Sequence, residues 1–271
     1  MIERVELGKT GINVSRLIYG TEPFALKKGP DGNRTQGDKT PKEGGAILSE
    51  ALKLGVNFWD TSDDYGTHPH VREGLKLVKR GEVAVSDKSN AATYEEGVKA
   101  LDFACRDLET DYIDVMFLHI VPPKPFVRLD ANSREYVSQD LKGRRGMLKA
   151  LVEAKESGRI KAVALSTHST QTLNQVLDYP EIDVVCTVLN KAGAVIDEAN
   201  LNNHINAIKR LHDDGRFVYV IKLLNAGRFR ENASEYIKWA LQHNEFIDAW
   251  NIGMYSVSDV KKNIALFSEV L

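Results

Sequence analysis

The sequence predicts a (β/α)8 barrel preceded by a β-hairpin, in one domain that spans residues 1–271. Three observations predict this fold. Short apolar runs, typical of parallel strands covered on both faces, alternate eight times with segments of helical spacing. Polar residues close several runs, at the strand ends where a barrel places its chemistry. An open doubly wound sheet accepts most of the alternation, but no G-x-G-x-x-G follows the first barrel strand.

The N-terminal residues predict the hairpin and the first barrel strand. Residues 5–7 and 12–14 are short apolar segments on either side of the turn residues 8–11, which include two glycines. We expect this hairpin to close the bottom of the barrel. The eight barrel strands are expected at residues 17–19, 56–59, 82–85, 113–118, 162–165, 184–189, 217–223 and 249–252.

Two of the helices between these strands carry clear start signals. Thr93 and Glu96 form a capping box, and the apolar residues after them recur at helical spacing, as Val98, Leu101, Cys105 and Leu108. Ser256 and Asp259 start the last helix in the same way. The longest irregular stretches, residues 22–40 and 121–138, follow the first and fourth strands and are expected on one rim.

The composition limits the partners of the protein. The sequence has 42% hydrophobic residues and a net charge of -2, so we expect a large apolar core and no broad attraction to nucleic acid or anionic lipid. No apolar run approaches the roughly 18 residues that cross a bilayer, and no apolar signal core follows the N-terminus, so we expect a cytoplasmic protein. Cys105 and Cys186 are expected to be buried thiols.

Four polar residues near the ends of three successive strands indicate proton chemistry. Asp60 ends the second strand with Tyr65 five residues later, Lys88 ends the third and His119 the fourth. A tyrosine ordinarily has a pKa near about 10, and we expect the ammonium of Lys88, held by Asp60, to lower it. Tyr65 could then protonate a carbonyl oxygen oriented by His119. The hydride for such a reduction must come from a nicotinamide cofactor.

The sequence resembles the aldo-keto reductase superfamily over nearly its whole length. The resemblance rests on LGKTGINVSRLIYGT, GVNFWDTSDDYG, the lysine of SDKSN, the histidine of DYIDVMFLH, AKESGRIKAVALSTHS and SVSDVKKNIALF. It implies a (β/α)8 barrel, with Asp60, Tyr65, Lys88 and His119 as the catalytic tetrad. It also implies a small carbonyl substrate, NADP(H) or NAD(H) as cofactor, and a monomer or weak homo-oligomer.

The resemblance also implies a set of cofactor-binding positions, some of which depart from the family pattern. Thr167 and His168 replace an Asn-Phe pair. Gly253 and Asp259 replace the basic residues that commonly hold the 2'-phosphate, so either NADH is accepted or another base compensates, namely Lys261, Lys262 or Arg228. Asp259 has a second interpretation as a helix cap. The implied positions are Gly20, Thr21, Asp60, Ser166, Thr167, His168, Asn190, Lys222, Leu224, Gly227, Met254, Tyr255, Ser256, Asp259, Lys262 and Asn263.

Two other functions compete with this interpretation. One is a metal-dependent barrel hydrolase, because His68 and His70 form H-x-H and further ligands are available at His119, His168, Asp60, Asp63 and Asp64. However, the H-x-H lies well past a strand end and is interrupted by a proline, so we expect no metal site. The other is a cofactor-binding regulatory protein with little turnover. The substitutions at Cys186, Ile221, Gly253 and Asp259 favour it, and the intact tetrad opposes it.

Overall fold

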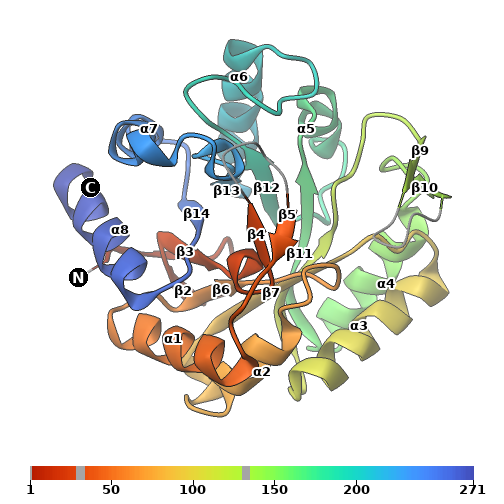
Figure 1. Cartoon of the computed structure of the whole chain (residues 1–271). Helices are drawn as coiled ribbons and strands as arrows, with labels where there is room; N and C mark the ends of the chain where they lie inside the picture. Colours follow the sequence, from red (N-terminus) through yellow and green to blue (C-terminus); the bar gives the residue numbers. More distant parts are fainter. Residues whose placement is uncertain (1, 29–33, 130–134) are drawn as a thin grey trace.

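Eight parallel strands close into a barrel, which confirms the predicted fold (Figure 1). The computed structural model describes residues 2–28, 34–129 and 135–271. The barrel order is β3, β6, β7, β8, β11, β12, β13 and β14, with β14 pairing back onto β3. The strands are β3 (Leu17–Gly20), β6 (Phe58–Asp60), β7 (Ala84–Ser89), β8 (Ile113–Leu118), β11 (Ile160–Thr167), β12 (Val184–Val188), β13 (Phe217–Ile221) and β14 (Ala249–Gly253).

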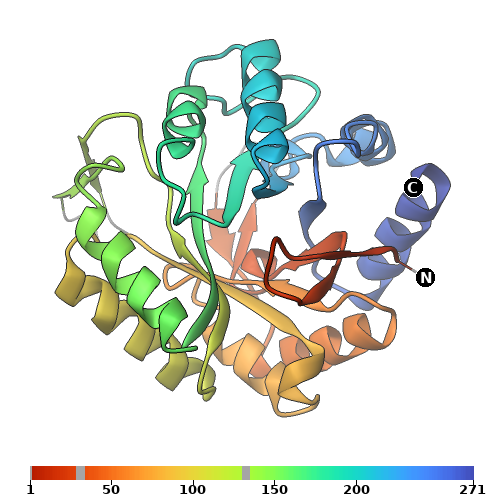
Figure 2. The same ribbon diagram turned by 180° about the vertical axis from the view of Figure 1, so that it is seen from behind.

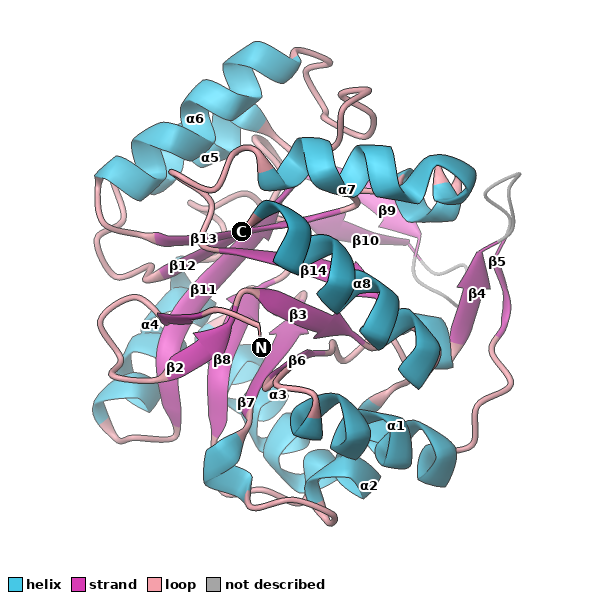
Figure 3. Cartoon of the chain, turned by 90° about the vertical axis from the view of Figure 1, so that its left-hand side faces the viewer, coloured by secondary structure: helices cyan, strands magenta, loops and turns pink. Residues whose placement is uncertain are grey.

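Helices cover the outside of the barrel (Figure 3). The predicted capping boxes are present: Thr93 accepts a hydrogen bond from the Glu96 amide, and Ser256 accepts one from the Asp259 amide. The α-helices are α1 (Pro41–Lys53), α2 (His68–Leu75), α3 (Tyr94–Leu108), α4 (Arg145–Glu156), α5 (Thr170–Val176), α6 (Leu201–Asp213), α7 (Ala233–Leu241) and α8 (Val257–Val270). Short 3-10 turns are η1 (Glu22–Phe24), η2 (Arg80–Glu82), η3 (Asn225–Gly227) and η4 (Arg230–Asn232).

The N-terminal hairpin lies at the end of the barrel away from the candidate site, as expected (Figure 2). Strands β1 (Arg4–Glu6) and β2 (Asn13–Ser15) pair antiparallel. Leu7 and Val14 are fully buried and belong to the same apolar cluster as Ile18 and Phe58 of the barrel interior. The hairpin therefore contributes apolar side chains that close the barrel floor.

Of the eight expected strands, only the one at residues 113–118 has the expected bounds, and the others differ by one to four residues at an end. Two of these differences concern the site. The third was expected at residues 82–85, but β7 spans Ala84–Ser89. The expected strand was too short because polar side chains follow Val85 and interrupt the apolar run on which the prediction rested. The seventh was expected to include Lys222, yet β13 ends at Ile221 and Lys222 has a left-handed backbone with φ of 63°. In both cases, functional positions made the strand end hard to recognise.

The two stretches expected to be irregular each contain a small antiparallel sheet. One is formed by β4 (Leu26–Lys28) and β5 (Arg34–Gln36), the other by β9 (Phe126–Leu129) and β10 (Glu135–Ser138). Both follow the carboxyl ends of barrel strands. Of the helices in the described parts of the chain, none is both long and apolar enough to cross a membrane.

Candidate active site

A buried ion pair between β6 and β7 forms the base of the site. The Nζ atom of Lys88 lies 2.7 Å from Oδ2 of Asp60 and donates a second hydrogen bond of 2.6 Å to the carbonyl of Thr61. Both side chains are about 3% exposed. Ser86, two residues before Lys88 on the same face of β7, donates to the other Asp60 oxygen at 2.5 Å. The pair is therefore fixed from both sides.

Tyr65 lies over this pair on the loop of residues 61–67. Its ring centre is 4.9 Å from Nζ of Lys88 and 6.1 Å from the His119 ring. Thr61 and Thr67, at the two ends of the loop, share a hydrogen bond of 2.7 Å between their hydroxyls. The loop is thereby closed into a tight turn that presents the phenol at the barrel mouth.

The pKa of Tyr65 shifts in the direction opposite to the expected one. Burial raises the pKa well above its ordinary value, and the nearby carboxylates of Asp60, Glu22 and Asp64 add to the increase. The positive charge of Lys88 is already paired with Asp60, and this explains why it does not reverse the effect. Tyr65 is therefore a neutral phenol at physiological pH in the cofactor-free protein.

His119 lies beside Tyr65, just after β8. Its Nδ1 atom is 3.3 Å from the hydroxyl of Ser62 and 3.8 Å from Asp64. Behind it, the fully buried Arg144 donates to the His119 carbonyl at 2.8 Å and to the Asn90 carbonyl at 3.1 Å. Arg144 thus ties together the chain segments that leave β7 and β8, and so fixes the position of the imidazole.

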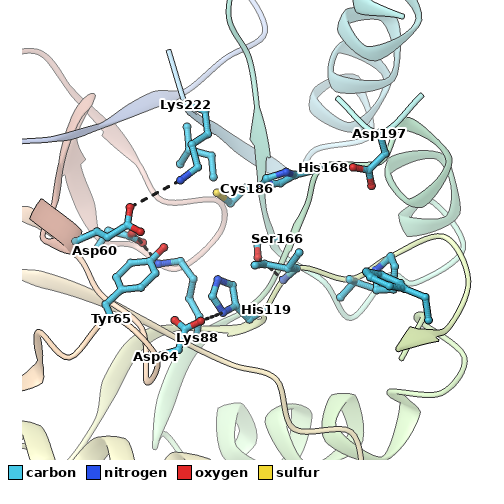
Figure 4. Close-up of a pocket in the computed structure, with 16 residues that line it drawn as sticks. Asp60, Asp64, Tyr65, Lys88, His119, Ser166, His168, Cys186, Asp197 and Lys222 are labelled. Carbon is cyan, nitrogen blue, oxygen red and sulfur yellow. Dashed lines mark hydrogen bonds and ion pairs between the residues drawn. The ribbon is translucent and has the colours of Figure 1, made fainter. Parts of the chain in front are cut away.

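These side chains line a cavity of about 330 Å³ at the carboxyl ends of the strands (Figure 4). That volume is at the lower end for small-molecule sites. All four members of the expected tetrad line it, together with three of the expected cofactor residues, Ser166, His168 and Lys222. The other lining residues are Glu22, Asp64, Ile120, Val121, Pro122, Phe126, Cys186, Asp197 and Ile221.

Several residues of the site were not selected from the sequence. Tyr219 donates a hydrogen bond of 3.0 Å to Asp60 from inside the barrel, and the strand alternation through β13 could have revealed it. Glu22 is 3.8 Å from Lys222 and comes immediately after the expected cofactor residue Thr21. Asp197 reaches the cavity from the long loop after β12, and no periodicity marks it. Apart from its charge, no feature of the sequence marked Arg144 as part of the site.

The β11 positions have different environments. Ser166 accepts a hydrogen bond of 2.8 Å from the Ile120 amide at the cavity wall. Thr167 instead donates to the Val121 carbonyl at 2.7 Å, so its hydroxyl holds the following loop. His168 lines the cavity near Asp197 in the close-up (Figure 4). Ser166 and His168 are thus the members of this segment that face the cavity.

Further expected cofactor positions lie after β12 and in the loop after β13, beside the cavity residue Lys222. Asn190 is fully buried and bonds to both the amide and the carbonyl of Ala194. Lys222, Asn225, Ala226 and Gly227 all have positive φ. Leu224 lies between them and accepts from the Gly227 amide. This run of left-handed residues makes a tight loop whose cationic entry residue is Lys222.

Positions on β3 and β14 form the adjacent part of the rim. Gly20 pairs with Gly253, and a Cβ on Gly20 would lie 2.5 Å from Oδ1 of Asn251 and 3.2 Å from the Gly253 backbone, so a larger residue would require the Asn251 side chain to move. Thr21 donates to the Asp60 carbonyl at 2.8 Å. The carbonyl of Met254 accepts a hydrogen bond of 2.9 Å from the buried Tyr19.

The start of α8 explains Asp259 structurally. One of its oxygens accepts hydrogen bonds from the Ser256 hydroxyl at 2.9 Å and the Tyr255 amide at 3.1 Å. The carboxylate therefore caps the helix, which is the second of the two interpretations left open by the sequence. Farther along α8, Lys262 is exposed and Asn263 is 9% exposed.

The H-x-H pair has structural partners. His70 hydrogen-bonds through Nε2 to the Lys39 carbonyl at 2.8 Å and stacks on Phe24. His68 lies between Asp87 and Asp107. Among the described residues, Asp63, Asp64 and His119 bring possible metal-ligand atoms within 4.8 Å of one another, but Ser62 bonds to two of the three. Hydrogen bonding thus accounts for most of this cluster.

The sequence matches known proteins over most of its length. The model of the aldo/keto reductase family matches residues 16–266. L-galactose dehydrogenase of Arabidopsis thaliana is 25% identical, with 99% of this chain and 89% of that protein covered. An NAD(P)H-dependent D-xylose reductase of Candida tropicalis is 30% identical over 44% of this chain and 42% of that protein.

Solved structures share the fold at low sequence identity. A putative aldo-keto reductase from Pseudomonas aeruginosa has a TM-score of 0.74 at 18% identity, with 98% of this chain and 94% of that chain covered. An aldo-keto reductase from Bacillus halodurans, in its holo form, has a TM-score of 0.72 at 16% identity, with coverages of 98% and 91%. The match of the family model over most of the sequence shows that the chain belongs to the aldo/keto reductase family.

Proposed function

We propose that the chain reduces aldehydes or ketones to alcohols with NAD(P)H, and that Tyr65 is the proton donor. The observation that carries the proposal is the position of this phenol in the cavity, 4.9 Å from an ammonium that is itself fixed by Asp60. The raised pKa keeps Tyr65 protonated but makes it a weaker acid than an ordinary phenol, so proton donation depends on Lys88 stabilising the phenolate. Names of relatives, such as the D-xylose reductase, support the use of NAD(P)H.

The donor groups along the rim fit a dinucleotide. Ser166 accepts from the Ile120 amide, so its hydroxyl proton is available for a carboxamide. The left-handed loop after β13 presents Lys222 and Arg228, whose charges suit a pyrophosphate. When bound, the reduced nicotinamide supplies the hydride. His119 would orient the substrate oxygen, and Lys88 would stabilise the negative charge left on Tyr65 after it gives up its proton.

The cavity favours neutral, hydroxylated substrates over anionic ones. Apart from the Asp60–Lys88 pair, its described lining contains three carboxylates and one ammonium, with Glu22 3.8 Å from Lys222, Asp64 3.8 Å from His119, and Asp197 near His168 (Figure 4). Carboxylates accept hydrogen bonds from substrate hydroxyls and repel substrate carboxylates. Relatives are named for L-galactose, D-xylose and glyceraldehyde, which are hydroxylated and uncharged. We therefore propose small hydroxyaldehydes as the substrate class.

The Tyr65→Phe variant tests the proposed reaction. With glyceraldehyde as substrate, we expect kcat to fall by about 100- to 10,000-fold, because general acid catalysis contributes that much. Binding of NADPH, followed by protein fluorescence, should change little. The matched control is Tyr94→Phe, which removes a phenol that donates to Glu153 on the outer helices. Wild-type turnover in Tyr65→Phe would show that another group donates the proton.

A second assay tests the substrate class. Glyceraldehyde and glyoxylate are both small aldehydes, but only glyoxylate carries a carboxylate. We expect kcat/KM to be at least tenfold higher for glyceraldehyde at low ionic strength, and we expect the difference to shrink when added salt screens the charges. A preference for glyoxylate would contradict the assignment of neutral substrates.

A further inference from the structure

A buried charged cluster lies on the outer side of β7, directly behind the catalytic lysine. It consists of His68, the first residue of α2, together with Asp87 of β7 and Asp107 of α3, and we call it the His68 cluster. Strand alternation sends Lys88 into the barrel and Asp87 toward the helices. Asp87 is completely buried and His68 is 3% exposed. The cluster is therefore part of the layer between the barrel and its helices.

The distances within the His68 cluster fit a charged imidazole between two ionised carboxylates. Nε2 lies 3.1 Å from Oδ1 of Asp87, and Nδ1 lies 3.0 Å from Oδ2 of Asp107. Ionised carboxylates only accept hydrogen bonds, so both ring nitrogens must donate, and only the protonated ring has two N–H groups. Burial alone would lower the pKa of His68, but hydrogen bonds and charges from the two aspartates outweigh burial and raise it.

The cluster is connected to the loop that carries Tyr65. His68 follows this loop, three residues after the phenol, and its contact with Asp87 anchors the loop's end on β7. At the other end, the Asp63 amide donates to the Lys88 carbonyl at 3.1 Å. The loop and His68 are thus attached to β7 at three successive residues, because the Thr61 amide also donates to the Ser86 carbonyl at 3.0 Å. Of these three attachments, the His68 contact is the one that follows Tyr65 in the chain.

The charged groups around the cluster show that the proton on His68 compensates the charge of Asp87. Asp63, on the loop, has its pKa raised to about 7 by burial and by the charge of Asp87. Arg72 of α2 contacts Asp107 at 3.4 Å, and the thiol of Cys105 on α3 also experiences the charge of Asp87. The second oxygen of Asp87 has no hydrogen-bond partner among the described residues. A neutral His68 would therefore leave a buried carboxylate without charge compensation.

We propose that charged His68 is a positioning residue for carbonyl reduction. By bridging Asp87 and Asp107 it holds the Tyr65 loop against the strand of Lys88, and loss of its proton loosens the loop and lowers turnover. This inference rests on the proposed function of Tyr65. It adds a residue that touches no substrate but sets the distance between Tyr65 and the lysine that supports it.

The pH dependence of kcat tests the proposal. In the wild type, kcat with saturating glyceraldehyde should decline as the pH rises through the titration of His68, long before Tyr65 itself ionises. In His68→Gln, we expect kcat at low pH to be about 10- to 100-fold lower, the effect of a small misplacement of a catalytic group, and the decline to be absent. The KM should change less than threefold. A variant with wild-type kcat, or with the same decline, overturns the proposal.

A rescue variant and a control separate positioning from general instability. The double variant H68Q/D87N removes the uncompensated charge and allows an amide to amide hydrogen bond, so it should regain several-fold of the kcat lost in His68→Gln. The control is Asp114→Asn on β8, which disrupts a buried pair with Arg80 of 2.7 Å at the opposite end of the barrel. It should lower Tm but keep the pH profile. A loss of kcat in the control equal to that in His68→Gln rejects the positioning role.

A spectroscopic measurement distinguishes this proposal from the proposed function. In cofactor-free protein labelled at histidine and tyrosine, the Tyr65 NMR resonance, assigned with Tyr65→Phe, should move together with the titration of His68 and stay constant in His68→Gln. Coupled resonances without carbonyl reduction would support the structural link while rejecting the reaction. Carbonyl reduction with uncoupled resonances would reject the positioning role of His68 alone.

Discussion

The two sides of the barrel bury polar groups in opposite ways. Strands β6 to β8 hold charged pairs, with Asp60 bound to Lys88 and Asp87 bound to His68. Strand β12 and the adjoining helices α5 and α6 hold neutral groups. There the fully buried His204 lies 2.9 Å from the hydroxyl of Thr170 and 3.0 Å from that of Thr187. The charged side contains the proposed proton chemistry, and the neutral side supports the wall where the cofactor is proposed to lie.

The two buried histidines, His68 and His204, differ in the direction of their pKa shifts. The pKa of His68 is raised by two carboxylates despite burial, whereas burial lowers the pKa of His204 to about 4 and outweighs the opposing effects of the Val188 backbone and of the Glu198 charge. Stability from His68 is present below the pKa of an unfolded histidine and is lost as the pH rises through its folded pKa. Stability from His204 is present above that value and is lost as the pH falls. The two sides therefore respond to pH in opposite directions.

Replacing Lys88 should have the largest effect of the variants on the charged side, on both kcat and the free energy of unfolding. In Lys88→Met we expect kcat to fall by about 100-fold or more, because the phenolate of Tyr65 loses its cation. The free energy of unfolding should fall by about 3–5 kcal/mol, because Asp60 is left buried and unpaired. Chemical denaturation and steady-state kinetics measure the two effects. The double variant with Asp60→Asn should recover stability but not kcat, and a stable, active single variant would contradict this account of the pair.

Acid should destabilise the neutral side through His204. The folded pKa of about 4 lies below the roughly 6.5 of an unfolded histidine, so roughly 3 kcal/mol of stability should be lost between pH 7 and pH 4. In His204→Gln this part of the acid dependence should disappear, since an amide can bond to Thr170 and Thr187 without titrating. Urea denaturation at several pH values checks it. An equal acid loss in wild type and variant would show that His204 does not cause it.

Asp63, on the charged side, should have a smaller effect on stability than His204. Its contribution should fall as the pH rises, whereas that of His204 falls as the pH decreases. Its folded pKa of about 7 lies above the value of an unfolded aspartate, so ionisation of Asp63 costs stability as the pH rises from about 4 through 7. We expect Asp63→Asn to raise Tm at about pH 8 more than at about pH 5. Because the residue as a whole is exposed although its carboxylate is partly desolvated, solvent screening should limit the gain to at most about 1 kcal/mol. A gain confined to acid pH would reverse the assigned sign.

The sequence predicts the charged side of the site better than the neutral one. Asp60, Lys88 and His119 each lie at a strand end or one residue from it, so their convergence follows from barrel topology. The electrostatic result could not be predicted, because whether Lys88 lowers the pKa of Tyr65 depends on burial and on carboxylates such as Glu22 that come from another loop. Asp197 and Arg144 contribute through tertiary contacts that leave no periodic signal. The extent of β7 was missed because its polar end reads as a loop.

The smallest expected effect concerns the preference for NADPH over NADH, which depends on the start of α8. Asp259 already accepts two hydrogen bonds as a helix cap, and Gly253 carries no charge, so the described start of α8 offers no obvious clamp for a 2'-phosphate. We expect NADPH and NADH to bind with affinities within about tenfold, as measured by fluorescence titration, because exposed lysines such as Lys262 contribute about 1 kcal/mol or less. Asp259→Asn should reduce the free energy of unfolding by about 1 kcal/mol through the weakened cap, and should shift the ratio of the NADPH and NADH affinities only a few-fold toward NADPH.

A preference above a hundredfold for NADPH in the wild type would require a strong phosphate site elsewhere on the rim. Loss of that preference in Lys262→Ala, but not in Arg228→Ala, would assign that site to α8 rather than to the loop after β13.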